Sequence, residues 1–114
     1  MQGNGLAFAA IKEDGGVVTW GDAGNGGDSS AMADKLSGGV VSVHGNGGAF
    51  AAMKENGSVV TWGQEDRGGD SSVVAEKLSA GIVAIESTAM AFAAIKERGG
   101  VVTWGELEEY LLLL

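Results

Sequence analysis

The sequence predicts a mainly β protein with short helices, built from three copies of one unit of about 42 residues. The first observation is that Trp20, Trp62 and Trp104 stand at a constant spacing. The second is that the segment ending just after each tryptophan repeats almost unchanged, as AFAAIKEDGGVVTWG, AFAAMKENGSVVTWG and AFAAIKERGGVVTWG. A fixed period of this length indicates one supersecondary unit copied along the chain, whose neighbours bury each other's apolar faces. The third is that two apolar runs flank a glycine-containing turn in each copy, which is typical of antiparallel strands.

The 114 residues make one small repeat domain, which we divide at about 1–38, 39–80 and 81–114, with the first and last repeats incomplete. Apolar residues form 45 % of the chain, which favours a packed core over disorder. The 21 glycines enlarge the unfolded ensemble, so tertiary packing has to compensate for them. Cysteine is absent, which excludes disulfides and thiolate metal sites.

The hairpin is the strongest local signal in each repeat. In the second copy, residues 49–54 are small or apolar apart from Lys54, Asn56-Gly57 follows, and residues 58–62 read SVVTW. Asn-Gly at this place predicts a two-residue turn with positive φ at both central positions. Asp14-Gly15 fits the same turn in the first copy, whereas Arg98-Gly99 fits it less well because positive φ is costlier for arginine.

A polar, glycine-rich loop follows each of the first two Trp-Gly pairs and leads into a predicted helix. Asp28 and Asp70 are placed to cap short helices over residues 29–36 and 71–78. Met32 with Leu36, and their counterparts Val74 and Leu78, would face the core from these helices. A further strand is predicted after each helix, over residues 40–43 and 82–85.

Side-chain alternation predicts how the hairpins pack. Phe8 and Ala10 point to one side of the first strand, while Ala9 and Ile11 point to the other. Neither side is polar, so we expect the strand to be covered on both faces, with the alanine face letting another sheet approach closely. The predicted structural core is the set of repeated aromatic residues: Phe8, Trp20, Phe50, Trp62, Phe92 and Trp104.

The last nine residues, ELEEYLLLL, depart from the repeat. Their apolar side chains are spaced as one stripe of a replacement helix, formed by Leu107, Tyr110, Leu111 and Leu114. Four terminal leucines would expose a large apolar area if they were left uncovered. We therefore expect this stripe to be an interface, buried against the rest of the chain or against a neighbour.

The order of these features resembles the regulator-of-chromosome-condensation repeat. Residues 43–63 match that repeat in order, with an Asp/Asn-Gly turn followed by Trp-Gly, and residues 49–53 stand where the family has His-Ser-Leu-Ala-Leu. The family histidine is Ala or Gly here, and its Gln-Leu-Gly is replaced by Gly-Asp-Ser-Ser. The resemblance implies propeller-blade-like antiparallel sheets with the tryptophans buried between them. It carries over no functional residue, because family function lies in loops that this sequence does not match.

A propeller closes with about four to eight blades, and this chain holds fewer than three complete ones. The blade interpretation therefore predicts a homo-oligomer, in which head-to-tail association of two copies closes a six-bladed ring. The alternative architecture is a pseudo-threefold monomer, like trefoil or prism folds.

No residue constellation predicts catalysis, a cofactor or a metal. The loop over residues 24–28 has neither nucleotide-binding glycine spacing nor a following lysine. Asp22, Asn25 and Asp28 supply too few oxygens for calcium, and Arg67 stands at the place of Asn25 in the next copy. His44 is the single histidine and has no cysteine cluster beside it, which argues against zinc.

The leading hypothesis is a non-enzymatic repeat module for self-assembly or protein interaction. The alternative is a small-ligand or glycan-binding module that uses the loops after Trp-Gly, residues 22–28 and 64–70. A net charge of −8 argues against binding nucleic acid or anionic membranes, since both need clustered Lys and Arg. The sequence shows no signal peptide or membrane-spanning run, so we expect a soluble, cytoplasmic protein.

Overall fold

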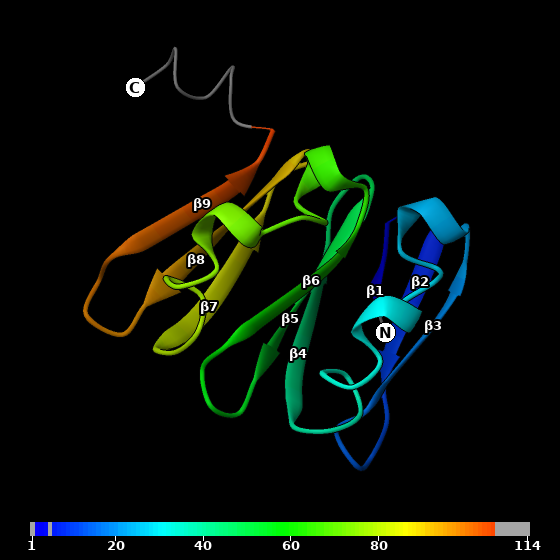
Figure 1. Cartoon of the computed structure of the whole chain (residues 1–114), viewed down its shortest axis with the longest axis horizontal. Helices are drawn as coiled ribbons and strands as arrows, with labels where there is room; N and C mark the ends of the chain where they lie inside the picture. Colours follow the sequence, from blue (N-terminus) through cyan, green and yellow to red (C-terminus); the bar gives the residue numbers. More distant parts are fainter. Residues whose placement is uncertain (1, 5, 107–114) are drawn as a thin grey trace.

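The computed structural model describes residues 2–4 and 6–106, and shows three antiparallel three-stranded sheets in a row (Figure 1). Sheet 1 has strands in the order β1-β2-β3, sheet 2 β4-β5-β6 and sheet 3 β7-β8-β9. The strands are β1 (Gln2–Gly3), β2 (Ala7–Ile11), β3 (Val17–Gly21), β4 (Val40–Gly45), β5 (Ala49–Lys54), β6 (Val59–Gly63), β7 (Ile82–Ser87), β8 (Ala91–Lys96) and β9 (Val101–Gly105). This confirms the predicted mainly β class, one blade-like sheet per repeat.

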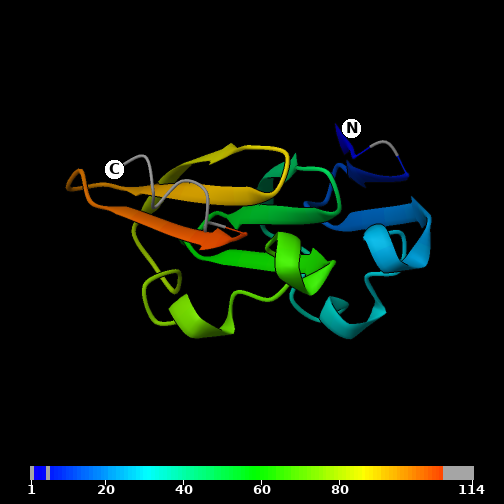
Figure 2. The same cartoon turned by 90° about the horizontal axis from the view of Figure 1, so that it is seen from above.

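In the described part of the chain, each helical segment is a single 3₁₀ turn. They are η1 (Ala23–Asn25), η2 (Ser30–Met32), η3 (Glu65–Arg67) and η4 (Ser72–Val74). Seen from above, all four lie on the side of the outer strands β3, β6 and β9 (Figure 2). None of these segments has the length and apolar character needed to cross a bilayer.

The prediction of eight-residue helices over 29–36 and 71–78 is wrong. Each segment forms one 3₁₀ turn followed by a hydrogen-bonded turn. Both ends of the segment are tied to the edge of the preceding strand. Ser29 Oγ lies 2.9 Å from Thr19 Oγ1, and the Val17 N–H donates to the Leu36 carbonyl at 2.8 Å. Asp28 still accepts the Ser30 N–H at 3.0 Å, as a capping residue would, but it starts a turn and not a helix.

The hairpin turns also differ from the prediction. Gly15 N–H donates to the Lys12 carbonyl at 2.9 Å, and Gly15 alone takes positive φ, at 82°. This leaves a three-residue loop with a left-handed last residue, the arrangement of a bulged hairpin turn. Asn56 does not take positive φ; its Oδ1 instead accepts the Ser58 N–H at 3.0 Å. In the third hairpin Gly99 likewise takes positive φ, at 89°, so Arg98 does not need a left-handed backbone.

The core consists of two separate layers, one between each pair of neighbouring sheets. In the first, Ala7 and Ala9 of sheet 1 meet side chains of sheet 2, among them Phe50 and Trp62. In the second, Ala49 and Ala51 of sheet 2 meet sheet 3 in the same way. Sheets 1 and 3 share neither layer, so the stack differs from the pseudo-threefold monomer that was the alternative.

The segments after η2 and η4 close the outer side of each layer. Leu36 and Leu78 are each 2 % exposed and belong to the first and second layer, respectively. Met32 and Val74 are half-buried and pack against the same layers. The hairpin tips bind the next sheet through the backbone, since the Val40 N–H donates to the Gly15 carbonyl at 3.0 Å.

Candidate interaction surfaces

The packing between sheets defines what each face of a sheet is built to do. Within sheet 2, Phe50 stacks on Trp62 with ring centroids 5.4 Å apart, and both rings are buried against sheet 1. The Trp62 indole N–H also donates to the Gly26 carbonyl, in the loop that follows sheet 1, at 3.0 Å. Phe92 and Trp104 of sheet 3 repeat the arrangement, with a 3.1 Å bond from Trp104 to the Gly68 carbonyl.

The loop glycines are required by this contact. Gly26 has φ 103°, and a Cβ on it would lie 2.5 Å from Phe50 Cδ2. Gly68 has the same φ and would place a Cβ 2.6 Å from Phe92 Cδ2. Any side chain here would push the loop off the aromatic pair. The glycine-rich loops after Trp-Gly are therefore part of the sheet-to-sheet contact.

An asparagine fixes each of these loops to its sheet, buried in the second repeat and half-buried in the first, and sequence reasoning missed it. Asn46 Oδ1 accepts the N–H groups of Gly48 and Ala49, each at 2.9 Å, while its side-chain amide donates to the Arg67 carbonyl. Asn4 makes the same set of contacts, with its amide donating to the Asn25 carbonyl. The recurrence of Gly-Asn-Gly one period apart is the signal that could have revealed this role.

On sheet 1 the aromatic pair faces away from the stack. Phe8 and Trp20 stack as in the other sheets, at 5.6 Å, but they are 39 % and 44 % exposed. The prediction that these two residues belong to the core is wrong, because no sheet in the described part of the chain lies against them. With Val18, which is 46 % exposed, they form what we call the aromatic face.

The opposite end of the stack carries an apolar hollow. It has a volume of about 240 Å³ on the side of sheet 3 that faces away from sheet 2 and is lined by Glu86, Ser87, Thr88, Ala91, Phe92, Ala93 and Thr103. The counterparts of Ala91 and Ala93 in sheet 2 are Ala49 and Ala51, both fully buried under sheet 3. The hollow is thus the place that a following sheet occupies in the other repeats. The predicted interface residues Leu107, Tyr110, Leu111 and Leu114 lie outside the described residues.

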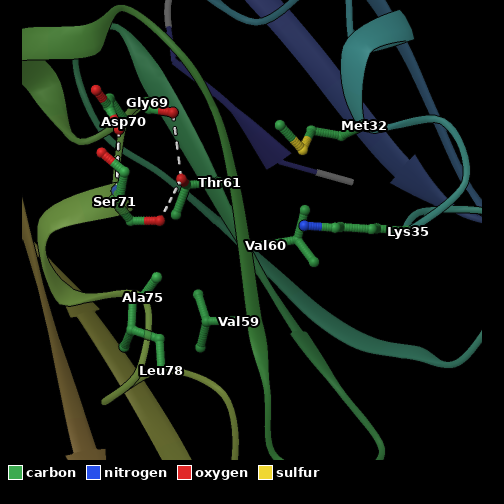
Figure 3. Close-up of a pocket in the computed structure, with 11 residues that line it drawn as sticks. Met32, Lys35, Val59, Val60, Thr61, Gly69, Asp70, Ser71, Ala75 and Leu78 are labelled. Atoms are coloured by element: carbon green, nitrogen blue, oxygen red, sulfur yellow. Dashed lines mark hydrogen bonds between the residues drawn. The ribbon is translucent and has the colours of Figure 1, made fainter.

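A groove runs along the outer edge of β6, between the loop segments of the first two repeats (Figure 3). Its volume is about 310 Å³. Met32 and Lys35 lie on one side of the strand, and Ser71 and Ala75 lie on the other (Figure 3). A second cavity of about 380 Å³ lies between the two Trp-Gly loops and shares Met32, Thr61, Gly69 and Asp70 with this groove.

The polar atoms of this groove mostly bond to one another. Thr61 Oγ1 donates to the Gly69 carbonyl at 3.2 Å and lies 2.9 Å from Ser71 Oγ, as Figure 3 shows. Asp70 Oδ1 accepts the Ser72 N–H at 2.9 Å. Hydrogen bonds from the side chain and backbone of Ser72 lower the pKa of the exposed Asp70 carboxyl, which keeps it charged.

The residues considered for metal binding or catalysis make hydrogen bonds to neighbouring side chains. Asn25 donates its amide to Asp22 Oδ2 at 2.6 Å and accepts from Gln64 across the two loops. His44 Nε2 lies 3.1 Å from Ser42 Oγ; burial lowers the pKa of its imidazole, while the Glu86 carboxylate acts in the opposite direction. Within residues 2–4 and 6–106, no three His, Cys, Asp or Glu side chains gather closely enough to hold a metal ion.

A scan against known protein-family models finds no match for this chain. A search of curated proteins also finds none.

Proposed function

We propose that the chain is a non-enzymatic repeat module for self-assembly or protein interaction, and that it works through the aromatic face. The observation that carries this proposal is the exposure of Phe8, Val18 and Trp20. The equivalent aromatic side chains in the other two repeats are buried against a neighbouring sheet. A face that is buried twice within the same chain is suited to being buried a third time by a partner.

The composition of the face supports an interaction role. Tryptophan and other aromatic side chains are enriched at the centres of protein interfaces, where they supply most of the binding energy. Contiguous exposed apolar side chains on a small protein are typical of interaction sites. The blade-like sheets also fit the resemblance to the regulator-of-chromosome-condensation repeat, which we retain as part of the proposal.

Sedimentation velocity over a range of protein concentrations tests this function. We expect the chain to associate, and Trp20→Asp to abolish association because it places a charge in the aromatic face. Val73→Asp is the matched control, since Val73 is 97 % exposed on η4, away from this face, and should leave association unchanged. A wild-type chain that stays monomeric and captures no other protein through this face would contradict the proposal.

The cavity between the two Trp-Gly loops, next to the groove along β6, favours a second candidate, the binding of a small ligand such as a glycan. The cavity of about 380 Å³ is lined by residues of both Trp-Gly loops, including Asp28, Glu65 and Asp70. Carboxylates beside half-buried apolar side chains can bind sugar hydroxyls through hydrogen bonds and apolar contacts. A glycan-array screen tests it: hits weakened by Glu65→Gln and Asp70→Asn would favour this function, and an array without hits would exclude it.

A further inference from the structure

The outer faces of sheets 1 and 3, against which no other sheet of the described residues lies, resemble the two halves of a contact that the chain already makes twice. Each internal contact joins an aromatic pair on one sheet to an alanine surface on the sheet before it. The aromatic face of sheet 1 has the first half of this contact without a partner. The apolar hollow of sheet 3 has the second half, and no sheet of the described residues lies against it, although of its two alanines Ala93 is half-buried and Ala91 is 3 % exposed.

The aromatic half is already in its docked arrangement. The Phe8 and Trp20 rings are 5.6 Å apart with their planes at 21°. The two buried pairs have separations of 5.4 and 5.5 Å and angles of 25° and 27°. Because the pair is held by the hairpin and not by the neighbouring sheet, little side-chain ordering is needed when a partner arrives.

The receiving half matches sheet 2 at the lining residues of β8 and β9, whereas Glu86, Ser87 and Thr88 stand where sheet 2 has His44, Gly45 and Asn46. In sheet 2 the aromatic side chains of sheet 3 are accommodated over Ala49 and Ala51, whose small side chains allow the two backbones to approach. Ala91 and Ala93 stand at the same places in sheet 3 and line the apolar hollow. Thr103 and Thr61 also correspond across the outer strands β9 and β6. Ala91, Ala93 and Thr103 of the hollow therefore match the residues over which an aromatic pair packs in sheet 2. Tyr110, which lies outside the described residues, stands at the place of the loop glycines Gly26 and Gly68.

We propose that a second copy of this chain docks head to tail, placing its Phe8 and Trp20 over Ala91 and Ala93 of the first in the register of the internal contacts. This inference rests on the proposed self-assembly and adds the partner, the second surface and the polarity of the contact. Sheet 1 of one copy then follows sheet 3 of the other as sheet 2 follows sheet 1.

Symmetric pairing of two aromatic faces is the main competing arrangement. It would set projecting rings against projecting rings, whereas the internal contacts set rings against alanines. It would also leave the apolar hollow uncovered. A head-to-tail contact uses two different surfaces, so blocking either surface stops association, while a symmetric contact uses only one of them.

Two variants, each blocked on one surface, separate these arrangements. Trp20→Asp blocks the aromatic face and keeps the hollow, whereas Thr103→Arg, at an exposed position on β9, blocks the hollow and keeps the aromatic face. Ala93→Arg serves as a second hollow variant, and Val73→Asp and Val73→Arg are charge controls away from both surfaces. Far-UV circular dichroism and urea unfolding confirm that each variant is folded.

We expect each blocked variant alone to lose at least about 30-fold in self-affinity, a typical effect of removing an interface hot spot. An equimolar mixture of Trp20→Asp with Thr103→Arg should restore association and stop at one copy of each, because only one intact pair of surfaces remains. Native mass spectrometry with one variant ¹⁵N-labelled identifies that mixed dimer. Both charge controls should associate like the wild type.

Three results would overturn the proposal. The first is self-association of both hollow variants at wild-type affinity with loss in Trp20→Asp, which indicates the symmetric contact and leaves the proposed function standing. The second is a mixture that forms no mixed dimer although the wild type associates. The third is a wild-type chain that is monomeric throughout; this also removes the self-assembly part of the proposed function, and so is distinguishable from the first two.

Discussion

Gly26→Ala is the substitution that most sharply tests the contact between sheets. Gly26 has φ 103°, where an alanine costs about 1–2 kcal/mol. The new Cβ would also lie 2.5 Å from Cδ2 of Phe50, which is fully buried. Overpacking of this kind costs about 1–3 kcal/mol. The free energy of unfolding should therefore fall by about 2–5 kcal/mol, a large part of what a small domain has.

Gly24→Ala is the matched control, two residues away in the same loop. A Cβ on Gly24 meets no atom within 4 Å, and its φ is not in the left-handed region. Alanine there should be neutral or stabilise by up to about 1 kcal/mol, because it restricts the unfolded chain. Urea unfolding followed by far-UV circular dichroism measures both variants at equal protein concentration. If Gly26→Ala unfolds within about 0.5 kcal/mol of the wild type, or if Gly24→Ala is equally damaging, the loop does not pack as described.

Three further predictions concern single side chains. Trp62→Phe should lower the free energy of unfolding by about 1–3 kcal/mol because it leaves the Gly26 carbonyl unpaired, whereas Trp20→Phe should change it by less than about 0.5 kcal/mol in protein dilute enough to be monomeric. Asn46→Ala should cost at least about 2 kcal/mol by urea unfolding, since it removes the buried acceptor of the Gly48 and Ala49 N–H groups and the donor to the Arg67 carbonyl. The loss should exceed that of Thr88→Ala, since the hydrogen bonds described for the Thr88 side chain are to its neighbours Met90 and Ala91. Burial lowers the pKa of His44 in the folded state below its ordinary value of 6.5. At pH values below 6.5 the unfolded state therefore binds the proton more readily than the folded state, and the free energy of unfolding decreases as the pH is lowered. Thermal melts between about pH 5 and 8 should show this dependence in the wild type relative to His44→Gln and no difference in slope above about pH 7; a constant difference across the range would contradict it.

The hairpins could be predicted from the sequence because their determinants are local. The apolar runs, the Asp14-Gly15 pair and its counterparts specify two strands and a reversal without help from the rest of the fold. The turn type was wrong because Asn-Gly also occurs in three-residue loops in which only glycine has positive φ. The side-chain carbonyl of Asn56 is used to accept the Ser58 N–H and needs no left-handed backbone.

The exposure of Trp20 could not be predicted from its own segment. The hairpins around Trp20 and Trp104 are almost identical in sequence, yet Trp104 is 5 % exposed and Trp20 is 44 % exposed. The difference depends on whether another sheet lies against the face that carries the tryptophan. The sequence of the hairpin alone does not predict this. The aromatic face and the apolar hollow therefore became visible only when the order of the stack was known.

The failed helix prediction has a similar cause. Residues 29–36 satisfy the capping and spacing rules of a short helix, but an isolated helix of this length has little stability of its own. Bonds from Thr19 and Val17 to the two ends of the segment hold it along the edge of β3 instead. Here a tertiary contact decided the local structure.

The most direct test of sheet stacking as the basis of both fold and assembly is oxidative footprinting of the three tryptophans as protein concentration rises. Mass spectrometry of the peptides reports each tryptophan separately in the unmodified chain. In dilute protein we expect Trp20 to be oxidised readily, while Trp62 and Trp104 are protected. As copies associate, Trp20 should become protected to the level of the other two. Equal oxidation of all three tryptophans in dilute protein would contradict the stacked fold, and a Trp20 that stays fully reactive at every concentration would contradict assembly through the aromatic face.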